Sequence, residues 1–177
     1  MYTFLDWIDV SKLSFNSLLL LEKVQLSWLL EGGVPDDEMA LALAANPTVE
    51  WYLRHKCSEL NGWLDQLAEK RKGQPIPDAE TCRNAEGMIM RRINDWLVYV
   101  IDPGIYDALP FLGWDSQELA SLVDFTGKTV LDIGSGTGRL AFVAAEKAAT
   151  VFAIEPVGRL REYIKTKART LGLQNVF

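Results

Sequence analysis

The chain has 177 residues, of which 49% are hydrophobic and 24% are charged, and its formal net charge is −6. This composition is typical of a folded globular protein and excludes a wholly disordered chain. Because acidic residues are in excess, a general nucleic-acid partner, which needs a basic surface, is not expected. The sequence contains no run of about 20 apolar residues, so we expect no membrane partner and a cytoplasmic location.

Charge and tryptophan are unevenly distributed along the chain. Residues 1–120 contain 10 Lys and Arg against 19 Asp and Glu, whereas residues 121–177 contain 8 against 5. All six Trp lie at or before Trp114. This contrast predicts two domains, an all-helical N-terminal segment over residues 1–114 and a second domain over residues 115–177.

Helical spacing dominates the first hundred residues. Apolar residues recur there at three- and four-residue steps, and Gly or Pro follows each run. The predicted helices cover residues 11–31, 35–45, 48–72 and 79–101. The clearest apolar stripe lies in the third of them and consists of Leu53, Cys57, Leu60, Leu64 and Leu67. The two cysteines of the chain are too few for a disulfide framework or a zinc site, so no metal is expected.

The pattern changes at residue 128, after which β-branched apolar runs alternate with amphipathic helices. Strands and helices that alternate at this spacing predict right-handed crossovers and a parallel sheet, so the fold class of this domain is α/β. The predicted elements, in order, are a short helix ending at 122, a strand at 128–133, a helix at 139–148, a strand at 150–154, a helix at 156–171 and a strand that begins at 174.

Three glycines join the first strand to the helix that follows it. Gly134 permits a sharp exit from the strand, Gly136 lets a ligand approach the backbone, and Gly138 lets the helix pack close to the sheet. The free N–H groups at the start of that helix suit a carboxylate or a phosphate. Glu155 ends the neighbouring strand, where its carboxylate can accept hydrogen bonds from both hydroxyls of a ribose. Together these residues predict a site for a nucleoside-containing cofactor.

The details of the loop favour a cationic ligand over a dinucleotide. In a loop of the form Gly-x-Gly-x-x-Gly the third glycine would stand at Arg139, but here it comes one residue earlier. Asp132 lies just before the loop, where its carboxylate would repel a pyrophosphate and attract an ammonium or sulfonium group. A ribose, a carboxylate and positive charges together describe S-adenosylmethionine better than NAD.

The run from Val130 to Gly138, followed by Glu155, resembles the first motif and the ribose-binding acid of class I S-adenosylmethionine-dependent methyltransferases. The resemblance covers residues 128–176 and implies a Rossmann-like, doubly wound parallel sheet. It implies that the cofactor-binding residues are Asp132, Gly134, Ser135, Gly136, Thr137, Gly138 and Glu155. Residues 1–114 carry no such resemblance, and comparable segments of these enzymes often form a substrate lid or a homodimer contact.

The family fold has a seven-stranded sheet, whereas this chain reaches only the start of the third strand. Because the residues that hold adenine and position the methyl acceptor come later in the family, we expect a fragment whose catalytic domain is incomplete and, by itself, inactive. No catalytic residue is named, and the acceptor is unidentified, with a small molecule favoured. The alternatives are an NAD(P)-binding oxidoreductase module and a non-catalytic partner-binding protein.

Aromatic residues immediately before the sheet are further candidates to approach the cofactor. They are Tyr106, Phe111 and Trp114. The only histidine, His55, stands between Arg54 and Lys56 and is predicted to be a solvated helix residue rather than a catalytic base.

Overall fold

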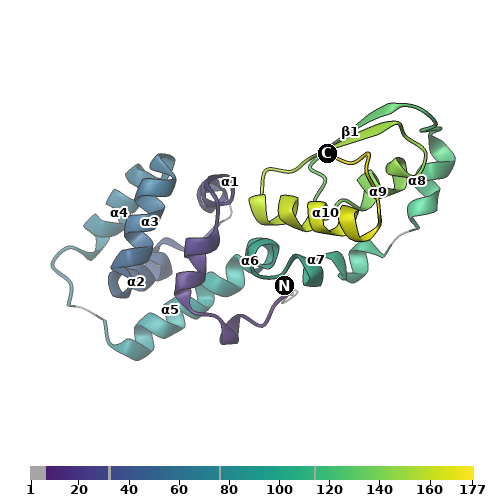
Figure 1. The fold of residues 1–177 in the computed structure, drawn as a ribbon. Helices are drawn as coiled ribbons and strands as arrows, with labels where there is room; N and C mark the ends of the chain where they lie inside the picture. The colour runs from purple at the N-terminus through teal and green to yellow at the C-terminus, as the bar shows by residue number, and fades with distance from the viewer. Residues whose placement is uncertain (1–6, 32, 76, 114) are drawn as a thin grey trace. The chain divides into compact units, whose positions relative to one another are not determined.

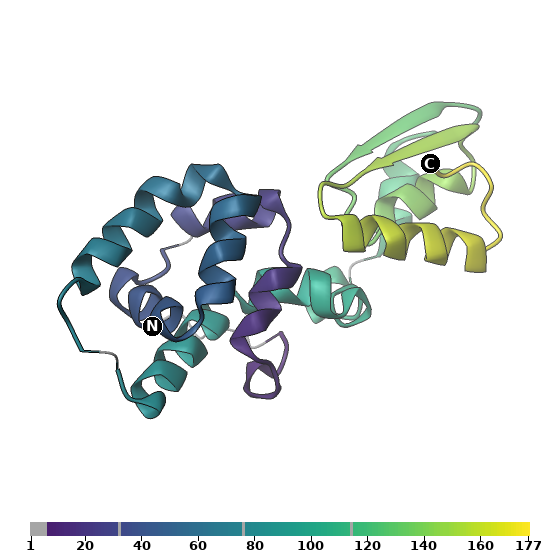
Figure 2. The same ribbon diagram turned by 60° about the vertical axis from the view of Figure 1, so that its left-hand side comes forward.

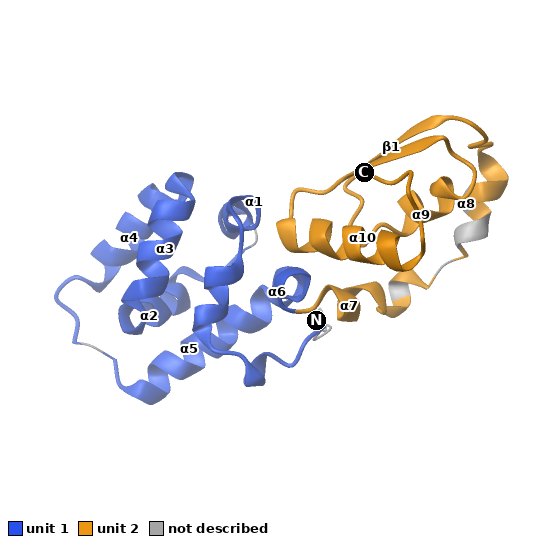
Figure 3. Cartoon of the chain, viewed as in Figure 1, with its two compact units in different colours: residues 1–101 blue, residues 102–177 orange. Residues whose placement is uncertain are grey.

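The computed structural model describes residues 7–31, 33–75, 77–113 and 115–177, and the chain divides into two compact units. The first unit is Met1–Ile101 and the second is Asp102–Phe177 (Figure 3). Residues 102–113, which were expected to belong to the helical segment, therefore fall in the second unit.

The described part of the first unit is helical (Figure 1). The α-helices are α1 (Lys23–Ser27), α2 (Asp36–Ala45), α3 (Pro47–Lys56), α4 (Asn61–Arg71), α5 (Ala79–Arg92) and α6 (Asn94–Ile101). Short 3-10 helices cover Val10–Lys12, Phe15–Leu20, Trp28–Leu30 and Ser58–Leu60. The predicted helix over 35–45 is confirmed, and three acidic residues in the first turn of α2 complement its positive end.

The single helix predicted over residues 11–31 is wrong, because this segment forms short helical turns around α1. The chain is extended at Glu22 (φ −90°, ψ 166°), which begins α1 through a reciprocal capping box with Gln25. Gln25 is fully buried, and its side-chain amide donates a hydrogen bond of 3.0 Å to the carbonyl of Trp96. This buried polar contact joins α1 to α6, and apolar spacing gives no sign of it.

The helices predicted over 48–72 and 79–101 are each broken once. Cys57 (φ −140°, ψ 88°) separates α3 from the following 3-10 turn and α4, and Ile93 (φ −109°, ψ 16°) separates α5 from α6. Both residues are completely buried, so each break lets two helices pack their apolar faces into one core. Every residue of the predicted stripe from Leu53 to Leu67 is at most 2% exposed.

The second unit contains a small parallel sheet. Strands β1 (Thr129–Ile133) and β2 (Thr150–Ile154) pair in parallel, and Val176 bridges β2 in the same direction. Because β1 and Val176 both pair with β2, the segment that begins a predicted third strand lies on the side of β2 away from β1. The helical elements of this unit are α7 (Pro103–Asp107), a 3-10 turn (Pro110–Leu112), α8 (Ser116–Leu122), α9 (Arg139–Ala145) and α10 (Gly158–Thr170).

The two faces of this sheet have different surroundings. On one face Val130, Val151 and Ala153 pack in clusters with residues of α9 and α10, and Figures 1 and 2 show both helices on the same side of the strands. The side chains of the other face are apolar and 44–76% exposed, and they are Leu131, Ile133, Phe152, Ile154 and Phe177. Strand residues thus alternate between a covered and an exposed face.

The architecture is mostly helical with a small parallel sheet, which agrees with an expected α/β class. Among the described residues, no helix combines the length and the apolar character that crossing a membrane requires.

Candidate functional site

The glycine loop leaves β1 at the carboxyl edge of the sheet. Gly134, Gly136 and Gly138 have positive φ angles of 75°, 56° and 83°, a region that other residues rarely adopt. The N–H groups of Gly134 and Ser135 donate to the carbonyl of Ile154 at 2.8 and 3.1 Å. These bonds fix the loop beside the end of β2, where ligands bind in open parallel sheets.

Gly138 is required by packing as well as by its backbone angle. A Cβ at this position would lie 2.9 Å from two ring carbons of Phe142 and 3.3 Å from Cγ1 of Ile164. The glycine therefore lets the beginning of α9 lie against its own Phe142 and against α10.

The other two glycines face less crowded space. No atom lies within 4 Å of a Cβ built on Gly134, and a Cβ on Gly136 would lie 3.7 Å from Cε1 of Tyr106. The loop therefore has room beside its backbone for a ligand, with the ring of Tyr106 at one side. The side chain of Phe111 and the whole of Trp114, which belong to the same prediction, lie outside the described part of the structure.

Two polar atoms beside the loop are buried without a hydrogen-bond partner. They are Oδ2 of Asp132 and Oγ of Ser135. Burial raises the pKa of Asp132, although a hydrogen bond from the backbone N–H of Ala141 opposes the shift. Because buried polar groups in native proteins are almost always paired, each of these two atoms is a place where a ligand group can supply the partner.

Glu155 reaches the loop but faces its backbone. The residue is 8% exposed, and its carboxylate accepts from the N–H of Gly136 at 3.0 Å and from the N–H of Val157 at 2.8 Å. The predicted proximity of Glu155 to the glycines is thus observed, whereas both carboxylate oxygens already accept bonds inside the chain.

Asp107, at the end of α7, is a residue of this region that the sequence analysis did not single out. Its carboxylate accepts hydrogen bonds from Thr137 at 2.7 Å, from Tyr163 at 3.1 Å and from Lys167 at 2.5 Å. Burial would raise the pKa of Asp107, but the hydrogen bonds from Lys167 and Thr137 outweigh burial and lower it. No local pattern distinguishes this acid, because its partners lie 30 to 60 residues away in the sequence.

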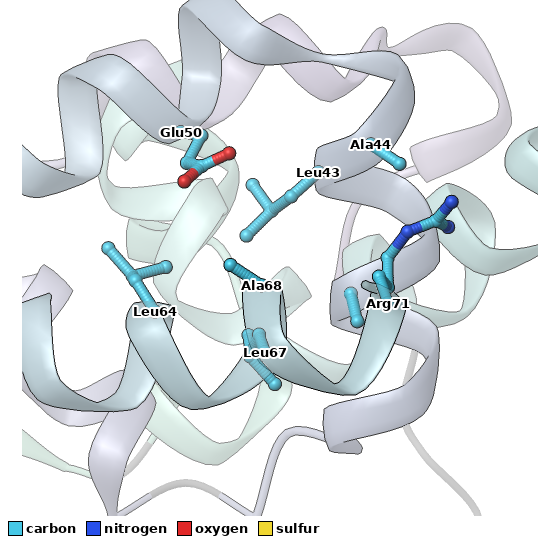
Figure 4. A pocket seen from close by; sticks show the side chains of 8 residues that line it. Leu43, Ala44, Glu50, Leu64, Leu67, Ala68 and Arg71 are labelled. Atoms are coloured by element: carbon cyan, nitrogen blue, oxygen red, sulfur yellow. The ribbon is translucent and has the colours of Figure 1, made fainter. Parts of the chain in front are cut away.

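The first unit contains a separate hollow of about 130 Å³ between α2, α3 and α4 (Figure 4). Figure 4 shows Leu43 and Ala68 between the two charged residues of its lining, Glu50 and Arg71. Glu50 pairs with Arg54 at 2.9 Å, and Nη1 of Arg71 is buried without a partner. No predicted site residue lines this hollow.

Comparisons of the chain with protein-family models, with curated proteins and with solved structures found no significant match. Any functional assignment must therefore be argued from the residues and their geometry.

Proposed function

We propose that this chain belongs to an S-adenosylmethionine-dependent methyltransferase and that its second unit is part of a Rossmann-like, doubly wound sheet. The observation that carries the proposal is the combination of an uncrowded glycine loop with the unpartnered Oδ2 of Asp132 beside it. The pairing of β2 with both β1 and Val176 supports the fold, because it matches the strand order 3-2-1 of one half of such a sheet.

A cationic ligand fits these residues better than a neutral one. An ionised carboxylate that is half-buried and has an unpaired oxygen is stabilised by a nearby positive charge, since the local dielectric is lower than that of water. The ammonium and sulfonium groups of S-adenosylmethionine supply that charge. The hydroxyl of Ser135 adds a second group that can donate to, or accept from, a ligand.

Glu155 must change partners if it is to hold a ribose. We infer that ribose hydroxyls replace the N–H of Gly136 as donors to Oε2, while the bond from Val157 to Oε1 persists. The released N–H of Gly136 then becomes available to the ligand. This exchange makes cofactor binding depend on the carboxylate of Glu155 and on the absence of a side chain at position 136.

The cofactor supplies a methyl group on a sulfonium sulfur, which passes in line to a nucleophilic atom of the acceptor as the carbon–sulfur bond breaks. The residues of this chain would orient the donor: the loop approaches it closely, Asp132 attracts its charge and Glu155 holds its sugar. Fixing the donor in this way contributes to the rate through proximity and orientation. The methyl acceptor and a catalytic base are not assigned to residues of this chain.

The proposal is tested by calorimetric titration of the chain with S-adenosylmethionine. We expect weak but saturable binding at high protein concentration, which Gly136→Ala and Glu155→Ala each abolish. Gly127→Ala is the matched control, because Gly127 also has a positive φ of 67° but lies before β1, outside the loop. Absence of binding, or equal binding by all variants, would refute the proposal, and tight binding of NADH or NADPH would favour the oxidoreductase alternative.

The partner-binding alternative is favoured by one observation, the exposed apolar face of the sheet. Five large apolar side chains on that face are 44–76% exposed, an arrangement that often marks an interaction surface. Size-exclusion chromatography with light scattering tests whether two copies of the chain associate through it. A chain that stays monomeric at high concentration argues against this second function.

A further inference from the structure

The carboxylate of Asp107 connects three elements of the second unit. It stands at the end of α7 and accepts hydrogen bonds from Thr137 in the glycine loop and from Tyr163 and Lys167 in α10. Nε of Arg139, the residue after the loop, is 3.7 Å from the same carboxylate. Asp107 is therefore the point at which α7, the loop and α10 are joined.

Burial makes these contacts stronger than those of a surface ion pair. The side chain of Asp107 is 15% exposed, that of Lys167 is 29% exposed, and Thr137 as a residue is 3% exposed. A carboxylate in such surroundings is held by charge-assisted hydrogen bonds, and removing it leaves its donors unpaired. The hydroxyl of Thr137 has Asp107 as its acceptor, so the orientation of this loop residue follows from the position of α7.

Tyr106, the residue before Asp107 in α7, borders the space beside the loop. A Cβ on Gly136 would lie 3.7 Å from Cε1 and 4.0 Å from the hydroxyl oxygen of Tyr106. A ligand atom at this position over Gly136 would therefore be in van der Waals contact with the Tyr106 ring. A cation held over the face of an aromatic ring is attracted by its π electrons, and Tyr106 is the ring that borders this space.

We propose that α7 is a part of the cofactor site, in which Asp107 is a positioning residue for the glycine loop and Tyr106 is the wall that contacts the positively charged part of the ligand. This inference rests on the proposed function for the identity of the ligand. The role of Asp107 in holding the loop does not depend on that identity.

The two roles lead to different effects of conservative substitutions. Thr137→Ser keeps the hydroxyl that Asp107 accepts from, whereas Thr137→Val removes it at nearly equal volume. Tyr106→Phe keeps the ring, whereas Tyr106→Leu removes the π-face and keeps a large apolar side chain. If Thr137→Ser and Tyr106→Phe behave like the unaltered chain while Thr137→Val and Tyr106→Leu do not, the hydroxyl and the aromatic ring are required, and not merely side chains of similar volume.

The first measurement is amide hydrogen exchange of the loop in the full chain, without ligand. We expect Asp107→Leu, which removes both acceptor oxygens, and Thr137→Val to raise the exchange rate over residues 134–138 by about tenfold, and Thr137→Ser to leave it unchanged. Asp102→Leu is the matched control, because the carboxylate of Asp102 accepts from the N–H of Gly104 at the start of the same helix. An exchange rate that rises equally in Asp107→Leu and Asp102→Leu, or in neither, would overturn the positioning role.

The second measurement is calorimetric titration with S-adenosylmethionine. We expect Tyr106→Leu to weaken binding by about tenfold and Tyr106→Phe to leave it near that of the unaltered chain. Equal affinities for the unaltered chain and Tyr106→Leu would refute the role of the ring while leaving the proposed function intact. If the unaltered chain binds no S-adenosylmethionine, the proposed function and the role of Tyr106 fall together, and the exchange experiment still decides the role of Asp107.

Discussion

Substitution of Gly138 by alanine is predicted to destabilise the second unit by two separable effects. Alanine would have to adopt the left-handed backbone angle of 83°, which costs about 1–2 kcal/mol. Its Cβ would also lie 2.9 Å from ring carbons of Phe142 and 3.3 Å from Ile164, and such overpacking typically adds about 1–3 kcal/mol. The free energy of unfolding should therefore fall by about 2–5 kcal/mol, a large part of the stability of an ordinary domain.

Two matched variants separate these effects. Gly127→Ala and Gly134→Ala also place alanine at positive φ, 67° and 75°, but no atom lies within 4 Å of the added Cβ. Each should lose only the conformational contribution of about 1–2 kcal/mol. The difference between these variants and Gly138→Ala measures the clash with α9 and α10.

Hydrogen exchange of the amides in β1 and β2 is the suitable assay, since their slowest amides report the opening of the second unit. We expect these amides to exchange faster in Gly138→Ala than in either control. If Gly138→Ala is no less stable than Gly127→Ala, the close packing of the loop against Phe142 and Ile164 is wrong.

Three further predictions concern the site and the sheet. Because burial raises the pKa of Asp132, its carboxylate ionises at higher pH than an ordinary Asp, so affinity for the cationic cofactor should rise with pH as this carboxylate ionises. Asp132→Asn should remove most of that rise in a calorimetric titration, and an unchanged pH profile would contradict the role of Asp132. Glu155→Ala leaves the N–H groups of Gly136 and Val157 without their acceptor and should lower the free energy of unfolding by about 1–3 kcal/mol. Glu155→Gln keeps one carbonyl acceptor, so its free energy of unfolding, measured by the same hydrogen-exchange assay, should fall by less. Ile133 is 76% exposed, so Ile133→Lys should reduce the fluorescence of a hydrophobic dye bound to the chain without unfolding it. Val151 is fully buried, so Val151→Lys should unfold the second unit. Equal dye binding by the unaltered chain and Ile133→Lys would contradict an exposed apolar face.

The parts of the fold that could be predicted are those specified by neighbouring residues. β-branched runs around Val130 and Val151 specify the strands, and three alternating glycines specify a turn that only a chain without side chains at those positions can make. Charges and proline at the start of α2 likewise act within one turn. Such signals are contained in a few consecutive residues and can be interpreted without knowledge of the tertiary structure.

The parts that could not be predicted depend on contacts between distant residues. Apolar spacing alone predicted a continuous helix through Glu22, because the buried hydrogen bond from Gln25 to Trp96 spans 71 positions. The same limitation applies to the site: Asp107 meets Thr137 and Lys167 only after α7 and α10 are folded. The inward-facing carboxylate of Glu155 is a third case, since its residue type predicted proximity to the loop but not its orientation.

The most direct test of the central claim is a calorimetric titration of the unaltered chain with S-adenosylmethionine and, separately, with NADH, repeated on Gly136→Ala. We predict weak but saturable binding of S-adenosylmethionine, no binding of NADH and loss of the S-adenosylmethionine signal in the variant. Absence of S-adenosylmethionine binding, or binding that the variant retains in full, would contradict the central claim.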